Sequence, residues 1–198
     1  TNNVATQIEL TTSAAGAKAG IAFTRQPVIK VKDAYGNQVK TSTGSGATVV
    51  ATVSSGGAPI GTASIQASQG IATFTDLGIG ALTGSYTITY TATLSASLSV
   101  TEAQSISVDY GTADHLAMAT QPVGGKTGDV LSTVPVVKIV DAYGNTVANS
   151  SASITAALTV ATNGDVVSGT SATAVNGIAT FSSLNVQTLP GTRKLLFT

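Results

Sequence analysis

The one histidine of the chain, His115, stands next to Asp114 in a sequence rich in serine, so a Ser-His-Asp triad is the first chemistry to consider. Neighbouring side chains of an extended strand point to opposite faces, which makes Asp114 a poor partner to orient the imidazole. In the internal repeat described below, position 115 matches Gln7, so the repeat does not require an imidazole there. We therefore predict an exposed linker histidine, no catalytic residue and no enzymatic activity.

The carboxylates are few and dispersed, whereas a paired acid and base site of the glycosidase kind needs two of them within roughly 5 to 10 Å. The best local grouping is Asp109 and Asp114, with Glu102 upstream, between the two halves of the chain. A calcium ion takes about six to eight oxygen ligands, and an ion bound here would stiffen the connection. We interpret these carboxylates as solvent-exposed charges of turns, and we assign no metal ligand and no cofactor. Calcium at Glu102, Asp109 and Asp114 is the alternative.

Lys30 and Lys138 occupy matching positions, which raises an intramolecular Lys–Asn isopeptide crosslink of the kind known in surface β-sandwiches. The alternation that buries Ile29 and Val31 turns Lys30 outward, so we predict that no such bond forms. Each crosslink would release one ammonia, and the intact mass of the chain would reveal it.

Alternate threonines in the segment Thr87–Thr93 form a row that could suggest an ice-binding or carbohydrate-binding face. Such a face needs the same pattern on neighbouring strands, and the second half of the chain has Lys194, Leu196 and Thr198 instead, so we interpret the row as ordinary solvent-facing residues. Sugar-binding platforms use exposed aromatic rings for stacking, and the chain has no Trp. The candidates for stacking are Tyr35, Tyr110 and Tyr143.

An internal repeat sets the elements that would position these side chains. The segment Pro27–Asn37 returns almost unaltered as Pro135–Asn145, 108 positions later, and Gly70–Phe74 returns as Gly177–Phe181, 107 positions later. An alternating strand that runs into Asp-x-x-Gly-Asn predicts a tight turn, because Asp accepts main-chain hydrogen bonds and Gly-Asn supplies positive φ. The predicted turn residues are Asp33, Gly36, Asn37, Asp141, Gly144 and Asn145.

Short segments rich in β-branched residues, separated by Gly, Pro, Asn or Asp, recur in both halves, and no stretch shows sustained helical periodicity. We predict an all-β fold of two tandem immunoglobulin-like β-sandwich domains, residues 1–110 and 111–198, since that fold has about seven strands in about 100 residues. The strands expected in the first domain are Thr6–Thr12, Ile21–Thr24, Val28–Asp33, Ala47–Val53, Ala63–Ala67, Ile71–Leu77, Tyr86–Thr93 and Gln104–Val108. The expected core consists of Ile29, Val31, Val49, Ile71, Phe74, Ile88 and Tyr90, with Val137, Ile139, Ile178, Phe181, Leu195 and Phe197 in the second domain.

The second repeat reaches Thr198 where the first is still in its penultimate strand, so the counterpart of Ala92–Val108 is missing and the second sandwich lacks its final strand. An open sheet edge invites pairing with another chain. We expect a fragment of a longer protein, and a strand donated by a neighbour is the alternative. The connection Val108–His115 has one Gly and no Pro-rich spacer, which favours a restricted hinge between sandwiches in series.

Charge and composition argue against several partners. Nine Lys and Arg balance nine Asp and Glu, and the basic residues are scattered, whereas nucleic acids and anionic membranes require clustered Lys and Arg. No apolar run approaches the roughly 20 residues that span a bilayer, so no membrane insertion is expected. The chain has no Cys and hence no disulfide framework. With 42% hydrophobic but only 5% aromatic residues, the cores are predicted to consist of Val, Ile, Leu and Ala.

The Val/Ile-rich strand with its Asp-Ala-Tyr-Gly-Asn turn, followed by Gly70–Phe74 and Gly84–Tyr90, resembles the bacterial immunoglobulin-like repeats of invasin and intimin type. Those repeats carry a similar Asp-x-x-Gly-Asn turn and a later Gly-x-Ala-x-Phe/Leu strand. The sequence departs from the pattern where Arg193 replaces Tyr86, so a tyrosine corner of the first domain cannot be shared by the second.

The resemblance implies a non-catalytic structural stalk or spacer in a larger secreted or cell-surface bacterial protein of the adhesin kind. The expected location is therefore extracellular, and the expected partners are neighbouring repeats of the same protein. The alternative is a binding module that contacts a glycan or a host-surface protein through the variable loops Ser42–Gly46, Ser54–Gly61 and Asn163–Gly169. These loops are poor in Trp, Tyr and Arg, which anchor most binding hot spots, and this favours the stalk.

Overall fold

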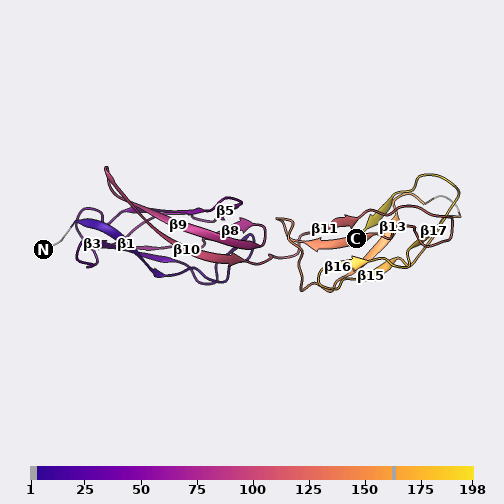
Figure 1. Ribbon diagram of the computed structural model, residues 1–198, viewed down its shortest axis with the longest axis horizontal. Helices are drawn as coiled ribbons and strands as arrows, with labels where there is room; N and C mark the ends of the chain where they lie inside the picture. The colour runs from indigo at the N-terminus through magenta and orange to yellow at the C-terminus, as the bar shows by residue number, and fades with distance from the viewer. Residues whose placement is uncertain (1–3, 162–163) are drawn as a thin grey trace. The chain divides into compact units, whose positions relative to one another are not determined.

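A computed structural model describes residues 4–161 and 164–198 of the chain. Every regular element among these residues is a β-strand, so the chain is all-β as predicted (Figure 1). The chain divides into two compact units, Thr1–Gly111 and Thr112–Thr198, one residue beyond the boundary expected from the sequence. We refer to them as unit 1 and unit 2. None of the described residues belongs to a helix long and apolar enough to cross a membrane.

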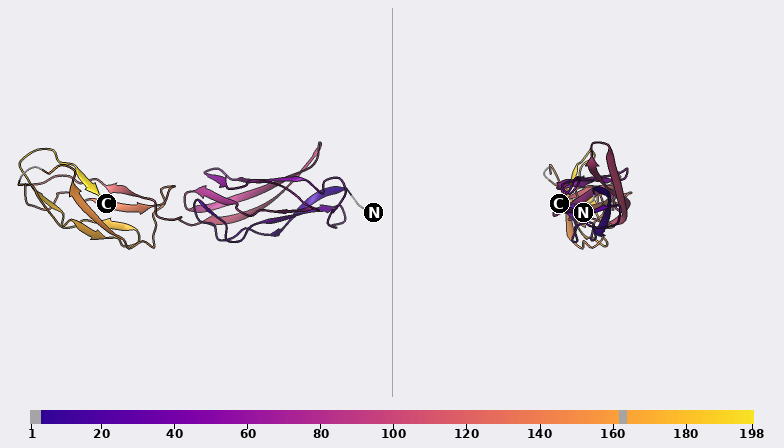
Figure 2. Two further views of the ribbon diagram at one scale, coloured as in Figure 1. Left: turned by 180° about the vertical axis from the view of Figure 1, so that it is seen from behind. Right: turned by 90° about the vertical axis from the view of Figure 1, so that its left-hand side faces the viewer.

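Unit 1 consists of short strands in three small sheets. The strands are β1 (Ala5–Thr12), β2 (Ile21–Ala22), β3 (Val28–Asp33), β4 (Thr48–Val53), β5 (Gly57–Ile60), β6 (Ser64–Gln66), β7 (Ile71–Thr73), β8 (Gly78–Ala81), β9 (Gly84–Ser95) and β10 (Leu98–Val108). The sheets have the strand orders β1-β3-β7, β10-β9-β4-β6 and β2-β8-β5. The two longest strands, β9 and β10, run side by side as an antiparallel hairpin that both sets of views show (Figure 1, Figure 2).

Unit 2 repeats part of this arrangement. Its strands are β11 (His115–Thr120), β12 (Val136–Val140), β13 (Ser153–Leu158), β14 (Val166–Ser168), β15 (Ser171–Thr173), β16 (Ile178–Thr180), β17 (Asn185–Gln187) and β18 (Leu195–Phe197). They form the sheets β11-β12-β16, β15-β13-β18 and β14-β17. The orders β11-β12-β16 and β15-β13-β18 correspond to β1-β3-β7 and β6-β4-β9 of unit 1.

The core of unit 1 is one buried cluster to which all three of its sheets contribute. The ring of Phe74, which follows β7, packs on the ring of Tyr90 from β9 with centroids 5.9 Å apart. This packing is consistent with a β-sandwich. The core prediction is confirmed for residues that are at most 1% exposed, namely Ile29, Val31, Val49, Phe74, Ile88 and Tyr90. In unit 2 it is confirmed for Val137, Ile139 and Phe181.

Ile71 and Ile178 are not core residues, which corrects the sequence prediction. In the register of β3 and β7, Ile29 stands opposite Ala72 and Lys30 stands opposite Ile71. Directly opposed residues share a face of the sheet, so Ala72 is buried with Ile29 whereas Ile71 lies on the outer face with Lys30. Ile178 of unit 2 is turned outward in the same way and is 38% exposed.

Some segments expected to be loops contain strands. β5 lies inside Ser54–Gly61, where the sequence Gly-Ala-Pro-Ile has no alternating pattern to reveal it. Its Pro59 is tolerated because β5 is an edge strand, paired only with β8 in its sheet. In unit 2, β14 lies inside the expected loop Asn163–Gly169, of which Asn163 is outside the described residues. In both units, the prediction from composition therefore made the loops longer than they are.

Candidate functional site

Asp33 closes a turn at the end of β3. The residue is 3% exposed, and its Oδ1 accepts hydrogen bonds from the main-chain N–H groups of Tyr35 and Asn37, both over 2.9 Å. The Asn37 side-chain amide donates to Oδ2 of Asp33 over 3.2 Å. Gly36 has a φ of +83°, in the left-handed region that favours glycine. The buried carboxylate is thus held by donors of its own turn.

Asp141 forms the same turn after β12. It is 1% exposed and accepts hydrogen bonds from the main-chain N–H groups of Tyr143 and Asn145, both over 2.9 Å. The amide of Asn145, which is itself buried, donates to Oδ2 of Asp141 over 2.9 Å. Gly144 has a φ of +87°. Because these bonds stay within the turn, the repeated motif organises the fold, and its carboxylates are not presented to a ligand.

His115 and Asp114 contact each other, which corrects the prediction that their side chains diverge. Nδ1 of His115 lies 2.9 Å from Oδ2 of Asp114. β11 begins at His115, so the alternation of a strand does not constrain Asp114. The two side chains are 53% and 58% exposed, as predicted for His115, although this residue belongs to β11 and not to the linker. An exposed pair of this kind contributes little to stability. Within the described residues, no serine hydroxyl is bonded to the imidazole.

Glu102 and Asp109 lie too far apart to share a calcium ion. Glu102 is inside β10, opposite Tyr90, and Asp109 follows the end of that strand. An extended strand rises about 3.3 Å per residue, which separates the two carboxylates by roughly 23 Å. In the described part of the chain, no three Asp, Glu or His side chains form a group that could hold a metal ion. A calcium ion at Asp109 and Asp114 without Glu102 stays the alternative.

Lys30 and Lys138 lie on the outer faces of β3 and β12, where alternation places them, and both are half-buried. Lys30 stands opposite Glu9 in the register of β1 and β3. On the same face, Nζ of Lys32 lies 3.1 Å from Oε2 of Glu9. Because this outer surface is charged, we expect ordinary lysine side chains there. The Lys–Asn crosslink stays the alternative.

The threonine row Thr87–Thr93 lies on the outer face of β9, and the neighbouring strands continue it. Thr52 of β4 stands opposite Thr89, and Thr101 of β10 stands opposite Thr91. The comparison between the two halves of the sequence could not reveal this, because the relevant neighbours are other strands of unit 1. The outer face of this sheet is therefore rich in hydroxyl groups, and Glu102 of β10 points away from it.

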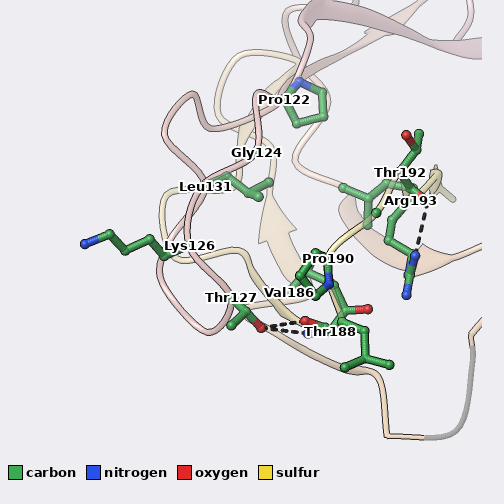
Figure 3. Close-up of a pocket in the computed structure, with 14 residues that line it drawn as sticks. Pro122, Gly124, Lys126, Thr127, Leu131, Val186, Thr188, Pro190, Thr192 and Arg193 are labelled. Atoms are coloured by element: carbon green, nitrogen blue, oxygen red, sulfur yellow. Dashed lines mark hydrogen bonds between the residues drawn. The ribbon is translucent and has the colours of Figure 1, made fainter.

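A groove in unit 2 is the feature that sequence reasoning missed. It has a volume of about 640 Å³ and lies between the segments Pro122–Thr127 and Thr188–Leu195 (Figure 3). Its walls include Pro122, Gly125, Thr127, Leu131, Arg193 and Leu195. Figure 3 shows the side chain of Lys126 extending away from the other lining residues. The accessible lining is thus supplied mainly by apolar side chains and main chain.

Arg193, which lines the groove, forms an ion pair with Asp165. Nε of Arg193 lies 3.2 Å from Oδ2 of Asp165, whose side chain is 2% exposed, and the hydroxyl of Thr188 donates to Oδ1 of the same carboxylate. In unit 1 the position of Arg193 is taken by Tyr86, whose hydroxyl donates to the carbonyl of Leu82 over 3.0 Å. Unit 2 therefore has a charged pair where unit 1 has a tyrosine. In the sequence, this difference is signalled by Arg193 at the position that matches Tyr86 of β9.

The strand β18 contributes Leu195 to the wall of the groove. In the described chain it pairs only with β13, whereas its counterpart β9 lies between β4 and β10. Leu195 and Phe197 are consequently half-buried, while Ile88 and Tyr90 at the corresponding positions are at most 1% exposed. Phe197 keeps an edge-to-face contact with Phe181, with ring centroids 5.1 Å apart. Leu195 and Phe197, which the sequence analysis places in the core, are thus only partly buried, because no described strand covers them.

Comparison of the chain with protein-family models, with curated proteins and with solved structures gives no match. The resemblance to repeats of invasin and intimin type therefore rests on the residues quoted for it alone. Fold and site together define an all-β protein of small sheets, with a buried Asp turn in each unit and a groove in unit 2.

Proposed function

We propose that the chain consists of two tandem immunoglobulin-like β-sandwich domains that act as a non-catalytic spacer in a larger secreted or cell-surface bacterial protein. The features that recur in both units support this proposal, since they are the buried turns of Asp33 and Asp141 and the ring pairs Phe74–Tyr90 and Phe181–Phe197. Each of them stabilises a fold and offers nothing to a substrate. A spacer requires stable modules and a short connection between them.

The observation that carries the proposal is the short connection between the anchored ends of the two units. In unit 1, Asp109 N donates to the carbonyl of Ala17 over 3.0 Å, and Asp109 O accepts from the N–H of Ala19 over 2.8 Å. In unit 2, Asp114 N donates to the carbonyl of Val140 over 2.8 Å. The connection between these two anchor points consists of residues 110–113, and so short a connection restricts the motion of a spacer.

Spin labels test the restricted hinge directly. Because the chain has no Cys, the substitutions Lys40→Cys and Thr173→Cys place one label on an exposed residue of each unit. We expect a narrow distribution of label distances, and a broad one in a control with a Gly-Ser insert between Gly111 and Thr112. A native distribution as broad as that of the control would overturn the spacer.

The exposed ring of Tyr35 favours a second candidate function, the binding of a glycan or a host-surface protein. Tyr35 is 82% exposed at its turn, and exposed aromatic rings can stack on sugars. The loop Ser42–Gly46 is less suited to adapt to a partner, since the carbonyl of Ser45 accepts a hydrogen bond from Gly70 N over 2.8 Å. Glycan-array and cell-binding assays decide between the functions: tight binding that Tyr35→Ala abolishes would favour the binding module.

A further inference from the structure

The groove of unit 2 lies at the place that β10 fills in unit 1. Ala15 and Arg25 of unit 1 exchange two main-chain hydrogen bonds, and Val123 and Thr133 of unit 2 exchange the same two. The segment around Val123 therefore takes the position of the segment 108 residues earlier. This match allows the two units to be compared residue by residue around the groove.

In unit 1, two walls hold β10. One wall is β9, which pairs with β10 along its length. The other wall is the main chain of Ala17 and Ala19, which bonds Asp109 on both sides, just after the end of β10. Ile106 and Val108 of β10 are buried between these walls, with 9% and 3% of their surface exposed.

The counterparts of both walls line the groove of unit 2. Gly125 and Thr127 stand where unit 1 has Ala17 and Ala19, and Leu195 belongs to β18, the counterpart of β9. Among the described residues, the main-chain groups of Gly125 and Thr127 form no hydrogen bond with another main-chain group, and the Thr127 hydroxyl bonds to the N–H and the carbonyl of Thr188. Both walls are thus present, and the described chain supplies no strand between them.

We propose that this groove is the acceptor site for one extended polypeptide strand, which pairs antiparallel with β18 and buries alternate apolar side chains between the two walls. The strand is joined to β18 by a short turn, because β10 is joined to β9 by the two residues Ala96 and Ser97. The assignment rests on the proposed function in one respect, namely that the two units belong to a longer protein.

The groove also selects the side chain that lies against Pro122 and Phe197. In unit 1 this place holds Gln104, whose Oε1 accepts hydrogen bonds from Ala14 N over 2.8 Å and from the Tyr90 hydroxyl over 3.3 Å. Pro122 stands at the position of Ala14 and has no N–H, and Phe197 stands at the position of Tyr90 and has no hydroxyl. An amide buried there would lose both donors. The strand that fits unit 2 therefore carries an apolar residue where β10 carries Gln104.

A graft of the chain's own segment tests this acceptor site. The segment Ala92–Tyr110 is attached after Thr198, since Thr198 matches Thr91 and the register is then preserved. The first graft keeps Gln104 and the second carries Gln104→Leu. A third, matched control carries Ile106→Ser and Val108→Ser, which remove the apolar side chains but leave the length and the turn unchanged. Hydrogen exchange at β18 and Gly125–Thr127 and the melting temperature of unit 2 are then measured.

We expect the Gln104→Leu graft to slow exchange at both walls and to raise the melting temperature of unit 2. The Gln104 graft has a smaller effect, and the Ser control has none. No protection by any graft, or equal protection by all three, would overturn the proposal. Concentration-dependent dimers of the ungrafted chain with a protected β18 would assign the groove to a second copy and also overturn it. None of these outcomes affects the label distances, so failure here is distinguishable from failure of the spacer.

Discussion

The rings of Phe74 and Tyr90 pack at the centre of unit 1 with centroids 5.9 Å apart and planes inclined by 49°. Tyr90 is fully buried, and its hydroxyl donates to Oε1 of Gln104 over 3.3 Å. In unit 2 the corresponding rings, Phe181 and Phe197, lie 5.1 Å apart at 62°. The two units therefore share an aromatic contact and differ by one hydroxyl group, which makes unit 2 an internal reference for the titration of Tyr90.

Alkaline pH should destabilise unit 1 through Tyr90. Burial raises the pKa of Tyr90, because the phenolate would lose its hydration. A tyrosine of the unfolded chain titrates near pH 10, so above that pH the unfolded state releases a proton that the folded state retains. This contribution is complete below about pH 10 and is lost above it, by up to about 1.4 kcal/mol per pH unit. Denaturant unfolding between about pH 8 and 11 should therefore show a steeper loss of stability for the native chain than for Tyr90→Phe, and equal slopes would contradict the prediction.

Replacement of Asp33 by Ala should destabilise unit 1 by about 1 to 3 kcal/mol, because it leaves the part-buried main-chain N–H groups of Tyr35 and Asn37 without their acceptor. The matched control is Asp114→Ala, which removes an exposed carboxylate and should change stability by less than about 0.5 kcal/mol. Urea unfolding followed for each unit separately measures both variants. Similar small losses for the two would show that the turn is not stabilised by its carboxylate.

Gly70→Ala should be more damaging than Gly36→Ala, although both glycines have positive φ, +76° and +83°. A Cβ at Gly70 would lie 2.3 Å from the carbonyl oxygen of Val39, whereas at Gly36 its nearest neighbour is Cε of Lys32 at 3.7 Å. Left-handed backbone alone costs a non-glycine residue about 1 to 2 kcal/mol. The contact with Val39 adds an overpacking term of about 1 to 3 kcal/mol. Thermal unfolding of the two variants checks the difference, and equal losses would rule out the close approach.

Millimolar calcium should leave the melting temperatures of both units unchanged, because Glu102 and Asp109 are separated by roughly 23 Å of extended strand. Differential scanning calorimetry with calcium and with a chelator measures this directly. A rise in melting temperature with calcium that disappears in Asp109→Ala would instead support a site built on Asp109 and Asp114.

The sequence predicts those elements whose local residue pattern is compatible with only one structure. β3 and β12 alternate apolar and polar residues and have one buried face, which determines the register of their side chains. The Asp turns are predictable because donor and acceptor lie within four residues of each other. The segment Gly70–Phe74 has apolar residues at both parities, so only its pairing with β3 decides that Ala72, and not Ile71, faces the core.

The groove and its walls could not be predicted in this way, because they depend on contacts between distant segments. Arg193 and Asp165 are 28 positions apart, and only the fold brings them together. The contact between His115 and Asp114 escaped prediction although the two residues are neighbours in the sequence. The alternation of side chains along a strand was applied to Asp114, which precedes the first residue of β11. The missing counterpart of β10 was visible in the sequence, but the shape of the space it leaves was not.

Pro122 and Phe197 also bear on how a chain of similar units reaches its native fold. Neighbouring modules with matching strands can exchange them during folding, which is a characteristic failure of tandem proteins. β10 finds two donors for Gln104 in its own unit, from Ala14 and Tyr90, and the groove of unit 2 offers neither. We therefore expect this small chemical difference between the units to favour correct strand partitioning and to disfavour misassembly between neighbours.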